Sequence, residues 1–248
     1  MEPFEIDGNE PLGVVLVHGF TATPFEVGYL GRKLADHGFS VSVPLLPGHG
    51  TTVEDLDETT WHQWAEAVAA AVERMAKRRR VALVGSSLGG LLSLYTASQR
   101  PEVSCVASLA APMWLDGVAR VAARLTRPGA LLDRVHRLPK LGGSDVRDPE
   151  MKRQNPSYRS IPTRALAQLM DFMEVVDAAL PTIEQPVLVL HGVHDHTAPV
   201  SCARYIATKT HARLRLLPES YHLLAIDVER DIVATEVEDF LRRHTEGT

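Results

Sequence analysis

Short runs of apolar, often β-branched residues alternate along this chain with longer stretches whose apolar residues recur at helical spacing. This alternation is typical of a parallel sheet flanked by helices, so the predicted fold class is α/β. The predicted strands cover 13–18, 39–44, 81–85, 103–109, 187–192 and 213–217. The predicted helices cover 24–37, 61–77, the stretch that ends at 99, and the neighbourhoods of 200–209 and 227–244.

Turn and cap residues set the limits of several of these elements. Gly38 directly follows the first predicted helix and is an expected stop signal. The stretch 45–57 is rich in proline and glycine and predicts a loop, after which Thr59 is the expected N-cap of the long helix. These signals separate the first half of the chain into successive strand and helix units.

The pattern changes between residues 113 and 180. No convincing strand is present there, and helical stretches are interrupted by proline and glycine. After residue 186 the strand and helix alternation resumes, which indicates an insertion into one domain. We therefore predict an α/β core formed by 1–112 and 181–248, with a helical cap over 113–180.

Charge and composition exclude several classes of function. The formal net charge of −5 at pH 7 opposes binding to a phosphate backbone, so nucleic acid is not an expected partner. No apolar run approaches the roughly 20 residues of a membrane-spanning helix. The beginning of the sequence has neither the basic nor the apolar region of a secretion signal. We expect a cytoplasmic protein, a monomer or a homodimer, in which Cys105 and Cys202 are reduced and packed.

The sequence Gly85-Ser86-Ser87-Leu88-Gly89 matches G-x-S-x-G and stands between a predicted strand and a predicted helix. A serine on such a tight turn is held in a strained conformation with its oxygen exposed, and flanking glycines avoid clashes. Ser87 has glycine two residues before and after it, whereas Ser86 does not. Ser87 is therefore the predicted nucleophile. The alternative is a glycine-rich turn without chemistry.

A serine hydroxyl needs a base to remove its proton, and the base needs a carboxylate that fixes its tautomer. Asp195 follows the predicted strand 187–192, and His222 follows the predicted strand 213–217. Both therefore lie in loops at the carboxyl edge of the sheet, in the order serine, aspartate, histidine. We predict that His222 is the base and that Asp195 orients it.

The reaction also needs donors for the developing oxyanion. By position, these are the backbone N–H groups of Leu88, directly after the nucleophile, and of Phe20, in the loop after the first central strand. The alternative for the loop at Phe20 is a turn that merely packs. His18 and His49 belong to His-Gly turns, where each ring is expected to bond neighbouring backbone.

Three histidines, His191, His194 and His196, surround Asp195, and such a cluster can indicate a metal site. Their spacing does not place three ligands on one side of a helix, and no second carboxylate joins them. A hydrogen-bond network around Asp195 is therefore favoured, and no metal is predicted.

Several motifs together resemble the bacterial carboxylesterase and monoacylglycerol lipase group of the α/β-hydrolases. HGFTATP resembles the group's HGFTG loop, PLLPGHG its P-x-x-x-GHG turn, ETTWHQW its TT-x-x-x-W helix start, GSSLGG its G-x-S-x-GG elbow, and SYHLLAID its S-x-H-x-x-x-x-D loop. The resemblance implies the α/β-hydrolase fold, a mostly parallel twisted sheet with a helical cap between the sixth and seventh strands. It also assigns nucleophile, acid and base to Ser87, Asp195 and His222.

The cap carries more apolar surface than a small polar substrate needs. Residues predicted to bind an acyl chain are Met113, Trp114, Leu169, Met170 and Met173, and further apolar cap residues are Leu115, Val118, Val121, Leu125, Leu166 and Phe172. The alternative is that these side chains pack the cap onto the core. A basic stretch of Arg120, Arg124, Arg127, Arg134 and Arg137 runs through the same segment, for which a solvated face is favoured over contact with an anionic interface or substrate.

These observations predict a serine carboxylesterase that hydrolyses short- to medium-chain esters through an acyl-enzyme, without any cofactor. The segment Pro112-Met-Trp-Leu resembles the carboxylesterases and offers no clear polar set for a glycerol headgroup. The alternatives are a monoacylglycerol lipase, or a thioesterase or acyltransferase with the same triad. A non-catalytic binding module is disfavoured, because serine, aspartate and histidine are all present.

Overall fold

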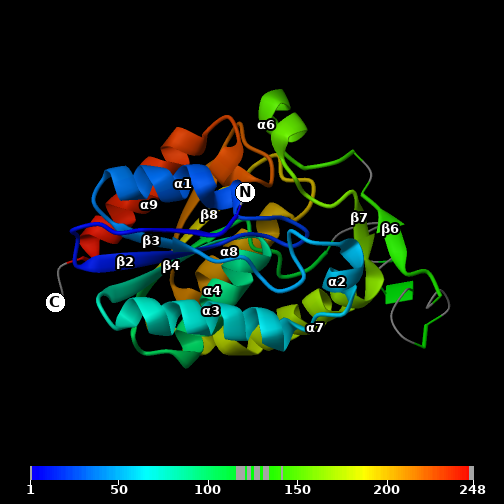
Figure 1. Cartoon of the computed structure of the whole chain (residues 1–248), viewed down its shortest axis with the longest axis horizontal. Coiled ribbons are helices and arrows are strands. Elements are labelled where there is room, and N and C mark those ends of the chain that lie inside the picture. The colour runs from blue at the N-terminus through cyan, green and yellow to red at the C-terminus, as the bar shows by residue number, and fades with distance from the viewer. Residues whose placement is uncertain are drawn as a thin grey trace.

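In the described part of the chain, seven strands form one sheet in the order β1-β3-β2-β4-β5-β8-β9 (Figure 1). The computed structural model describes residues 2–115, 121, 124–125, 129–130, 134–140 and 142–245. β1 is antiparallel to β3, and every other neighbouring pair is parallel, which confirms the predicted mostly parallel sheet. The strands are β1 (Phe4–Ile6), β2 (Leu12–Val17), β3 (Ser40–Val43), β4 (Arg80–Ser86), β5 (Val103–Leu109), β8 (Val187–Gly192) and β9 (Arg213–Leu217).

Two hydrophobic clusters fill the two faces of this sheet. β2 sends Val15 and Val17 into one cluster and Val14 and Leu16 into the other, because successive side chains of a strand point to opposite faces. Burial on both faces explains why central strands such as β2 and β8 are near-continuous apolar runs. One face is covered by α1 (Phe25–Asp36) and α9 (Arg230–Arg243), and the other by α3 (Trp61–Ala76), α4 (Leu88–Gln99), α7 (Thr163–Ala179) and α8 (Val200–Thr210) (Figure 1).

Most predicted elements are observed, and the predicted strands at 103–109, 187–192 and 213–217 coincide with β5, β8 and β9. The prediction of Thr59 as the N-cap of α3 is wrong. The cap is Thr60, whose backbone N–H donates to Gln63 Oε1 at 2.8 Å in a capping box. Thr59 instead accepts a hydrogen bond from the Trp64 indole at 3.0 Å.

Two short elements in the first half are missing from the prediction. β1 is a three-residue edge strand, and α2 (Val53–Asp57) lies inside the predicted loop 45–57. The N-cap of α2 is Thr52, whose side chain accepts a hydrogen bond from the Asp55 N–H at 3.1 Å. Both elements are too short to show a hydrophobic period, which is the signal that reveals longer elements.

The segment between β5 and β8 contains strands as well as helices. β6 (Arg137–Pro139) pairs antiparallel with β7 (Ser160–Pro162), so the expectation that 113–180 contains no strand is wrong. Each strand includes a proline, which weakens a strand pattern. α6 (Pro149–Gln154) lies between them, and α7 follows β7. β5 and β8 are the fifth and sixth strands of this sheet in chain order, so the insertion follows the fifth strand.

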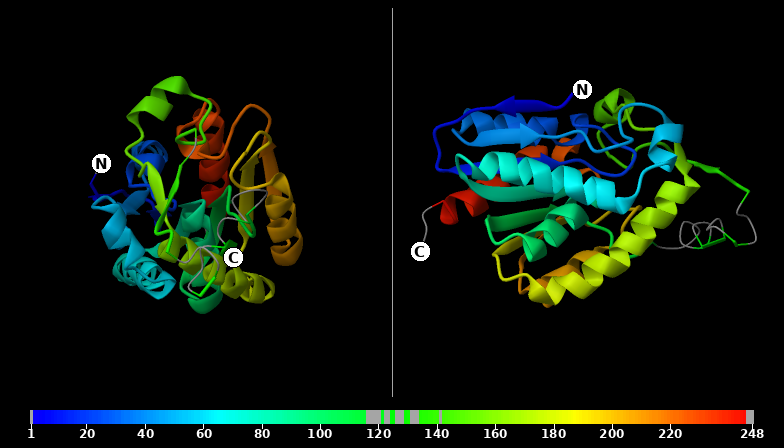
Figure 2. Two further views of the ribbon diagram at one scale, coloured as in Figure 1. Left: turned by 90° about the vertical axis from the view of Figure 1, so that its right-hand side faces the viewer. Right: turned by 60° about the horizontal axis from the view of Figure 1, so that its bottom comes forward.

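The insertion contacts the loops at the carboxyl ends of the parallel strands. The elements α6, β6 and β7 lie beyond these loops (Figures 1 and 2). The Tyr158 backbone N–H donates to Thr21 O at 3.0 Å, in the loop after β2. The Tyr158 hydroxyl donates to Gly48 O at 2.9 Å and accepts from the Thr51 N–H at 3.0 Å. One side chain of the insertion thereby joins the loops that follow β2 and β3.

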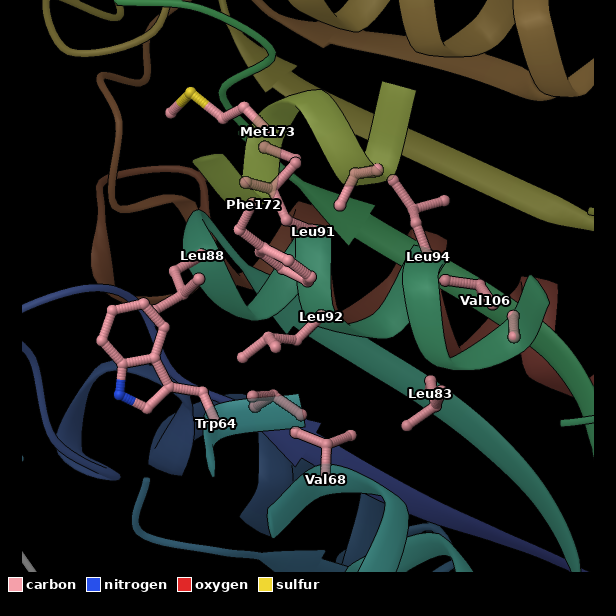
Figure 3. Packing of buried hydrophobic residues seen from close by; sticks show 14 of the residues in the cluster. Trp64, Val68, Leu83, Leu88, Leu91, Leu92, Leu94, Val106, Phe172 and Met173 are labelled. Atoms are coloured by element: carbon pink, nitrogen blue, oxygen red, sulfur yellow. The ribbon is translucent and has the colours of Figure 1, made fainter. Parts of the chain in front are cut away.

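The helix α7 packs against α4 as part of the main core. Phe172 is fully buried, stacks on Trp61 with ring centroids 5.2 Å apart, and meets the edge of Tyr95 at 5.4 Å. Figure 3 shows Phe172 beside Leu91 and Leu92 of α4. Although α7 lies within 113–180, it therefore covers the sheet in the same way as α3 and α4.

Replacing Phe172 with alanine should destabilise the whole domain, because the ring fills a closed space between α7 and α4. We expect a loss of about 3–5 kcal/mol in the free energy of unfolding, measured by urea denaturation. Ile232→Ala on α9 is the control, since that side chain is 42% exposed. A loss at Phe172 no larger than the loss at Ile232 would contradict the assignment of α7 to the core.

Candidate active site

The turn between β4 and α4 holds Ser87 in an unusual backbone conformation. β4 ends at Ser86 and α4 begins at Leu88, and between them Ser87 has φ 53° and ψ −116°. A positive φ is strained for a residue with a side chain. A Cβ atom on Gly89 would lie 2.1 Å from Val17 O, and one on Gly85 would lie 2.0 Å from Gly89 O. The two glycines therefore allow α4 to begin directly against β2 and β4, with the serine projecting from the turn.

Ser87, Asp195 and His222, which the sequence predicts as one set, lie together in the structure. His222 Nε2 is 2.9 Å from Ser87 Oγ, and His222 Nδ1 is 2.8 Å from Asp195 Oδ2. In the neutral ring, Nδ1–H donates to the carboxylate and Nε2 accepts from the serine hydroxyl. All three side chains are buried. This chain of contacts can transfer a proton from the serine to the ring.

The carboxylate of Asp195 receives hydrogen bonds on both oxygens. Oδ1 accepts from the backbone N–H groups of Thr197 at 2.8 Å and Ala198 at 2.7 Å. Oδ2 faces His222 and also lies 3.1 Å from His191 Nε2. His191 Nε2 is 2.9 Å from Ala198 O, and a carbonyl can only accept, so this nitrogen carries a proton. Asp195 is therefore satisfied without solvent.

For Asp195 and for His222, burial and the charge of the partner shift the pKa in opposite directions. Burial disfavours the charged form of Asp195, but the charge of His222 and the hydrogen bonds from His191 and His222 outweigh it and hold the pKa of Asp195 far below its ordinary range. Burial also opposes protonation of His222, but the Asp195 carboxylate raises the pKa of that ring above its ordinary value. Asp195 is thus ionised beside a ring that readily takes up a proton.

Two backbone N–H groups near the nucleophile, those of Phe20 and Leu88, have no hydrogen-bond acceptor among the described residues. A Cβ atom on Gly19 would lie 3.2 Å from Ser87 Cβ, so the loop that continues to Phe20 touches the serine. Within the described residues, neither the Phe20 N–H nor the Leu88 N–H donates a hydrogen bond to the protein. Leu88 is the first residue of α4, where N–H groups have no partner inside the helix. Both groups are available to an incoming oxygen, as their predicted oxyanion roles require.

His18 supports this loop from within the protein. Its Nδ1–H donates to Gly19 O at 3.0 Å, and its Nε2 accepts from the Leu46 N–H at 3.1 Å. Burial and the neighbouring His49 lower the pKa of His18 to about 3, so the ring stays neutral. His49 Nδ1–H donates to Pro47 O at 3.0 Å. The prediction that both rings bond neighbouring backbone is confirmed.

Glu26 is a buried carboxylate beside the site that the sequence reasoning missed. Its Oε2 accepts from the Gly19 N–H at 2.9 Å, and its Oε1 accepts from the Ser86 hydroxyl at 2.6 Å. It therefore joins the loop after β2 to the nucleophile turn. A signal is present in the sequence, because position 26 stands four residues before Leu30 and eight before Leu34, on the apolar stripe of α1.

The three histidines around Asp195 point to different partners. His191 contacts Asp195, whereas His196 Nδ1 bonds Asp145 Oδ1 at 2.9 Å and His194 packs near the Tyr221 ring. No three metal-binding side chains of the described residues form a cluster that could hold an ion. The predicted hydrogen-bond network around Asp195 is thus formed by His191 and His222. Asp145, from the insertion, is a further neighbour that no sequence pattern indicates.

The five residues predicted to bind an acyl chain lie in or against one hydrophobic cluster. Met113, Leu169 and Met173 are buried members of the cluster that also contains Leu88, and Trp114 and Met170 pack against it. Figure 3 shows Phe172 and Met173 projecting from α7 on the side of Leu88.

A surface hollow lies on the opposite side of α7 and does not include these five residues. It is lined by Asp57, Glu58, Thr59, Thr60, Arg164, Ala167, Gln168 and Asp171. Because a helix turns about 100° per residue, Ala167 and Asp171 project away from Leu169 and Met173. The acyl-binding role of the five residues stays a prediction.

The basic stretch of the insertion is only partly described. Arg120 and Arg127, like the apolar Val118, lie outside the described residues. Arg124 and Arg134 are exposed, and Arg137 forms an ion pair with Glu54 of α2. The described arginines of this stretch therefore face solvent or, for Arg137, pair with α2. None of the described helices has the length and apolar character needed to cross a bilayer.

Comparison with known proteins shows to which family the chain belongs. Residues 14–236 match the alpha/beta hydrolase family. The chain is 32% identical to a thermostable monoacylglycerol lipase of Bacillus sp. over 98% of its own length and 95% of that protein. It is 27% identical to a carboxylesterase of Bacillus subtilis, covering 98% of this chain and 96% of that one.

A solved structure is similar to this chain as well. One from work on LipS and LipT, two metagenome-derived lipolytic enzymes, superimposes with a TM-score of 0.88 at 27% identity and covers 98% of both chains. The predicted enzyme class, ester hydrolase, is confirmed by these similarities. The strand order, the serine turn and the matched relatives lead to one conclusion: the chain belongs to the alpha/beta hydrolase family.

Proposed function

We propose that this protein is a serine carboxylesterase that hydrolyses short- to medium-chain esters through an acyl-enzyme. Ser87 is the nucleophile, His222 the general base, and Asp195 the carboxylate that orients the base. The observation that carries the proposal is the unbroken contact from Ser87 Oγ to His222 Nε2 at 2.9 Å and from His222 Nδ1 to Asp195 Oδ2 at 2.8 Å. The strained serine turn and the free N–H groups beside it support the same roles.

The reaction proceeds in two halves. Ser87 Oγ attacks the ester carbonyl carbon while His222 takes the hydroxyl proton, and the carbonyl oxygen becomes an oxyanion held by the Phe20 and Leu88 N–H groups. His222 then protonates the departing alcohol, which leaves the acyl group on Ser87. Water next attacks the acyl carbon while His222 accepts its proton, and collapse of the second intermediate releases the carboxylic acid and returns the proton to Ser87.

The insertion is assigned the role of a cap over this site. The division into a core of 1–112 and 181–248 and a cap of 113–180 belongs to the proposal, with α7 as the part of the insertion that packs on the core. It is supported by the Tyr158 contacts with the loops after β2 and β3, which bring the insertion beside the oxyanion loop. Leu169 and Met173 share a cluster with Leu88, next to the nucleophile, so the acyl chain is assigned to this apolar side.

A monoacylglycerol lipase is the second candidate, because a protein of that name is 32% identical to this chain over nearly its whole length. The carboxylesterase is preferred because the segment after Ala111 continues Pro112-Met-Trp-Leu, without a polar set for glycerol. Thioesterase or acyltransferase chemistry would use the same acyl-enzyme with another acyl donor or acceptor.

A fluorophosphonate reagent should label Ser87 and abolish ester hydrolysis. Mass spectrometry of the digested protein should locate the adduct on Ser87 in the wild type and also in Ser86→Ala. Ser87→Ala should stay folded, remain unlabelled and lose at least about 10⁴-fold in kcat/KM. Labelling of Ser87→Ala, or an adduct on Ser86, would disprove the assignment.

The pH dependence of kcat/KM should show an acidic limb with its midpoint above pH 6.5, the ordinary pKa of histidine being about 6.5. Only neutral His222 can accept the serine proton, and the Asp195 carboxylate raises the pKa of the ring, so activity is lost earlier as the pH falls. Stopped-flow assays with a p-nitrophenyl ester over a buffer series measure this limb. A midpoint below pH 6 would be incompatible with His222 paired to an ionised Asp195.

Two substrates that differ only in the alcohol separate the first two candidates. Methyl octanoate and 1-monooctanoylglycerol carry the same acyl chain, so any difference in kcat/KM reports recognition of glycerol. The carboxylesterase proposal predicts rates within about tenfold of each other, since no headgroup contacts contribute binding free energy. A preference of about a hundredfold or more for the glyceride would favour the monoacylglycerol lipase.

A further inference from the structure

One stretch of the insertion, residues 144–148, lies between the loop after β8 and the loop after β9. These two loops carry Asp195 and His222. The backbone carbonyl of Asp145 accepts from the N–H groups of His222 at 3.2 Å and Leu223 at 3.1 Å. The insertion therefore binds the backbone of the base itself.

The side chain of Asp145 binds the other loop. Its Oδ2 accepts from the His196 N–H at 2.9 Å and from the Thr197 hydroxyl at 3.0 Å, and its Oδ1 accepts from His196 Nδ1 at 2.9 Å. Thr197 in turn donates its backbone N–H to Asp195 Oδ1 at 2.8 Å. One residue of the insertion thus holds both the loop of the acid and the loop of the base.

A second carboxylate, that of Asp227, also binds the stretch 144–148. Asp227 is fully buried, and its Oδ1 accepts from the N–H groups of Arg147 at 2.9 Å and Asp148 at 3.0 Å. Its Oδ2 accepts from the Tyr221 N–H at 2.7 Å, directly before His222. Asp227 therefore fixes the position of this stretch relative to the loop that carries His222. The contacts of Asp145 are a fixed part of the site for this reason.

We propose that Asp145 is a positioning residue for the reaction, which sets the relative placement of the Asp195 and His222 loops and places a negative charge near the base. This inference rests on the proposed function. Asp145 acts through His222 and through the Thr197 contact to Asp195.

The charge of Asp145 is one of several near the base. Asp195 on the acid loop and Glu26 on α1 also act on His222. Around these carboxylates, His191 on β8 contacts Asp195, His196 bonds Asp145, and the charge of Lys140 in the insertion acts on Asp145 and Glu26. Burial lowers the pKa of His222, and the carboxylates of Asp195, Asp145 and Glu26 raise it. Removing the charge of Asp145 should therefore make the imidazolium harder to form.

Asp145→Asn tests both parts of the role, because it keeps the shape of the side chain and removes the charge. We expect kcat to fall about tenfold with KM nearly unchanged, since misplacement of catalytic groups affects the chemical step more than binding. The acidic limb of kcat/KM should shift to lower pH. Asp148→Asn is the matched control. It removes the same charge three residues along, where Asp148 caps α6 and asparagine caps equally well.

Thr197→Val provides a second variant if Asp145→Asn folds poorly. It deletes one hydrogen bond to Asp145 and keeps the charge, so kcat should fall without a shift of the acidic limb. Fluorophosphonate titration of each variant gives the number of active sites, and circular dichroism verifies folding. An Asp145→Asn profile identical to that of Asp148→Asn, or a change in KM alone, would overturn the proposal. Absence of Ser87 labelling in the wild type would instead overturn the proposed function.

Discussion

Asp195 is an ionised carboxylate whose side chain is closed to solvent, and an unpaired charge in such a place would cost several kcal/mol. Its four contacts come from its own loop, from His191 at the end of β8 and from His222 in another loop. The sheet order makes this possible, because β8 and β9 are parallel neighbours whose loops emerge side by side. The position of His222 relative to Ser87 depends on this one charge being satisfied.

Much of this arrangement could be predicted from the sequence where the signal is local. Buried parallel strands such as β5 and β8 are apolar runs with sharp ends, and the glycines around Ser87 mark the tight turn. The relation of Ser87, Asp195 and His222 follows from loops at one edge of a parallel sheet. The N-cap of α3 lies one residue after the predicted position. Thr59 and Thr60 are both good N-cap residues, and only the contact of Thr60 with Gln63 decides between them.

The parts that could not be predicted depend on contacts distant in the sequence. β6 and β7 are three-residue strands separated by more than 20 positions, and each exists because the other is present. Asp145 stands in a polar stretch without periodicity, and its importance depends on where the insertion lies against two other loops. Glu26 had a detectable signal, a carboxylate on an apolar helix stripe, but its partners Gly19 and Ser86 are known only from the fold.

The hydrogen bonds of Tyr158 have a consequence for the evolution and engineering of substrate range. The segment between β5 and β8 is tied to the core loops and is not an independent module. Here Tyr158 occupies the space between the loops after β2 and β3, and its hydroxyl satisfies Gly48 O and the Thr51 N–H. A transplanted segment without an equivalent side chain would leave two backbone groups unpaired beside the oxyanion loop. Chimeras of this enzyme therefore require junctions that retain Tyr158 as well as residues 144–148, which bind the loops of Asp195 and His222.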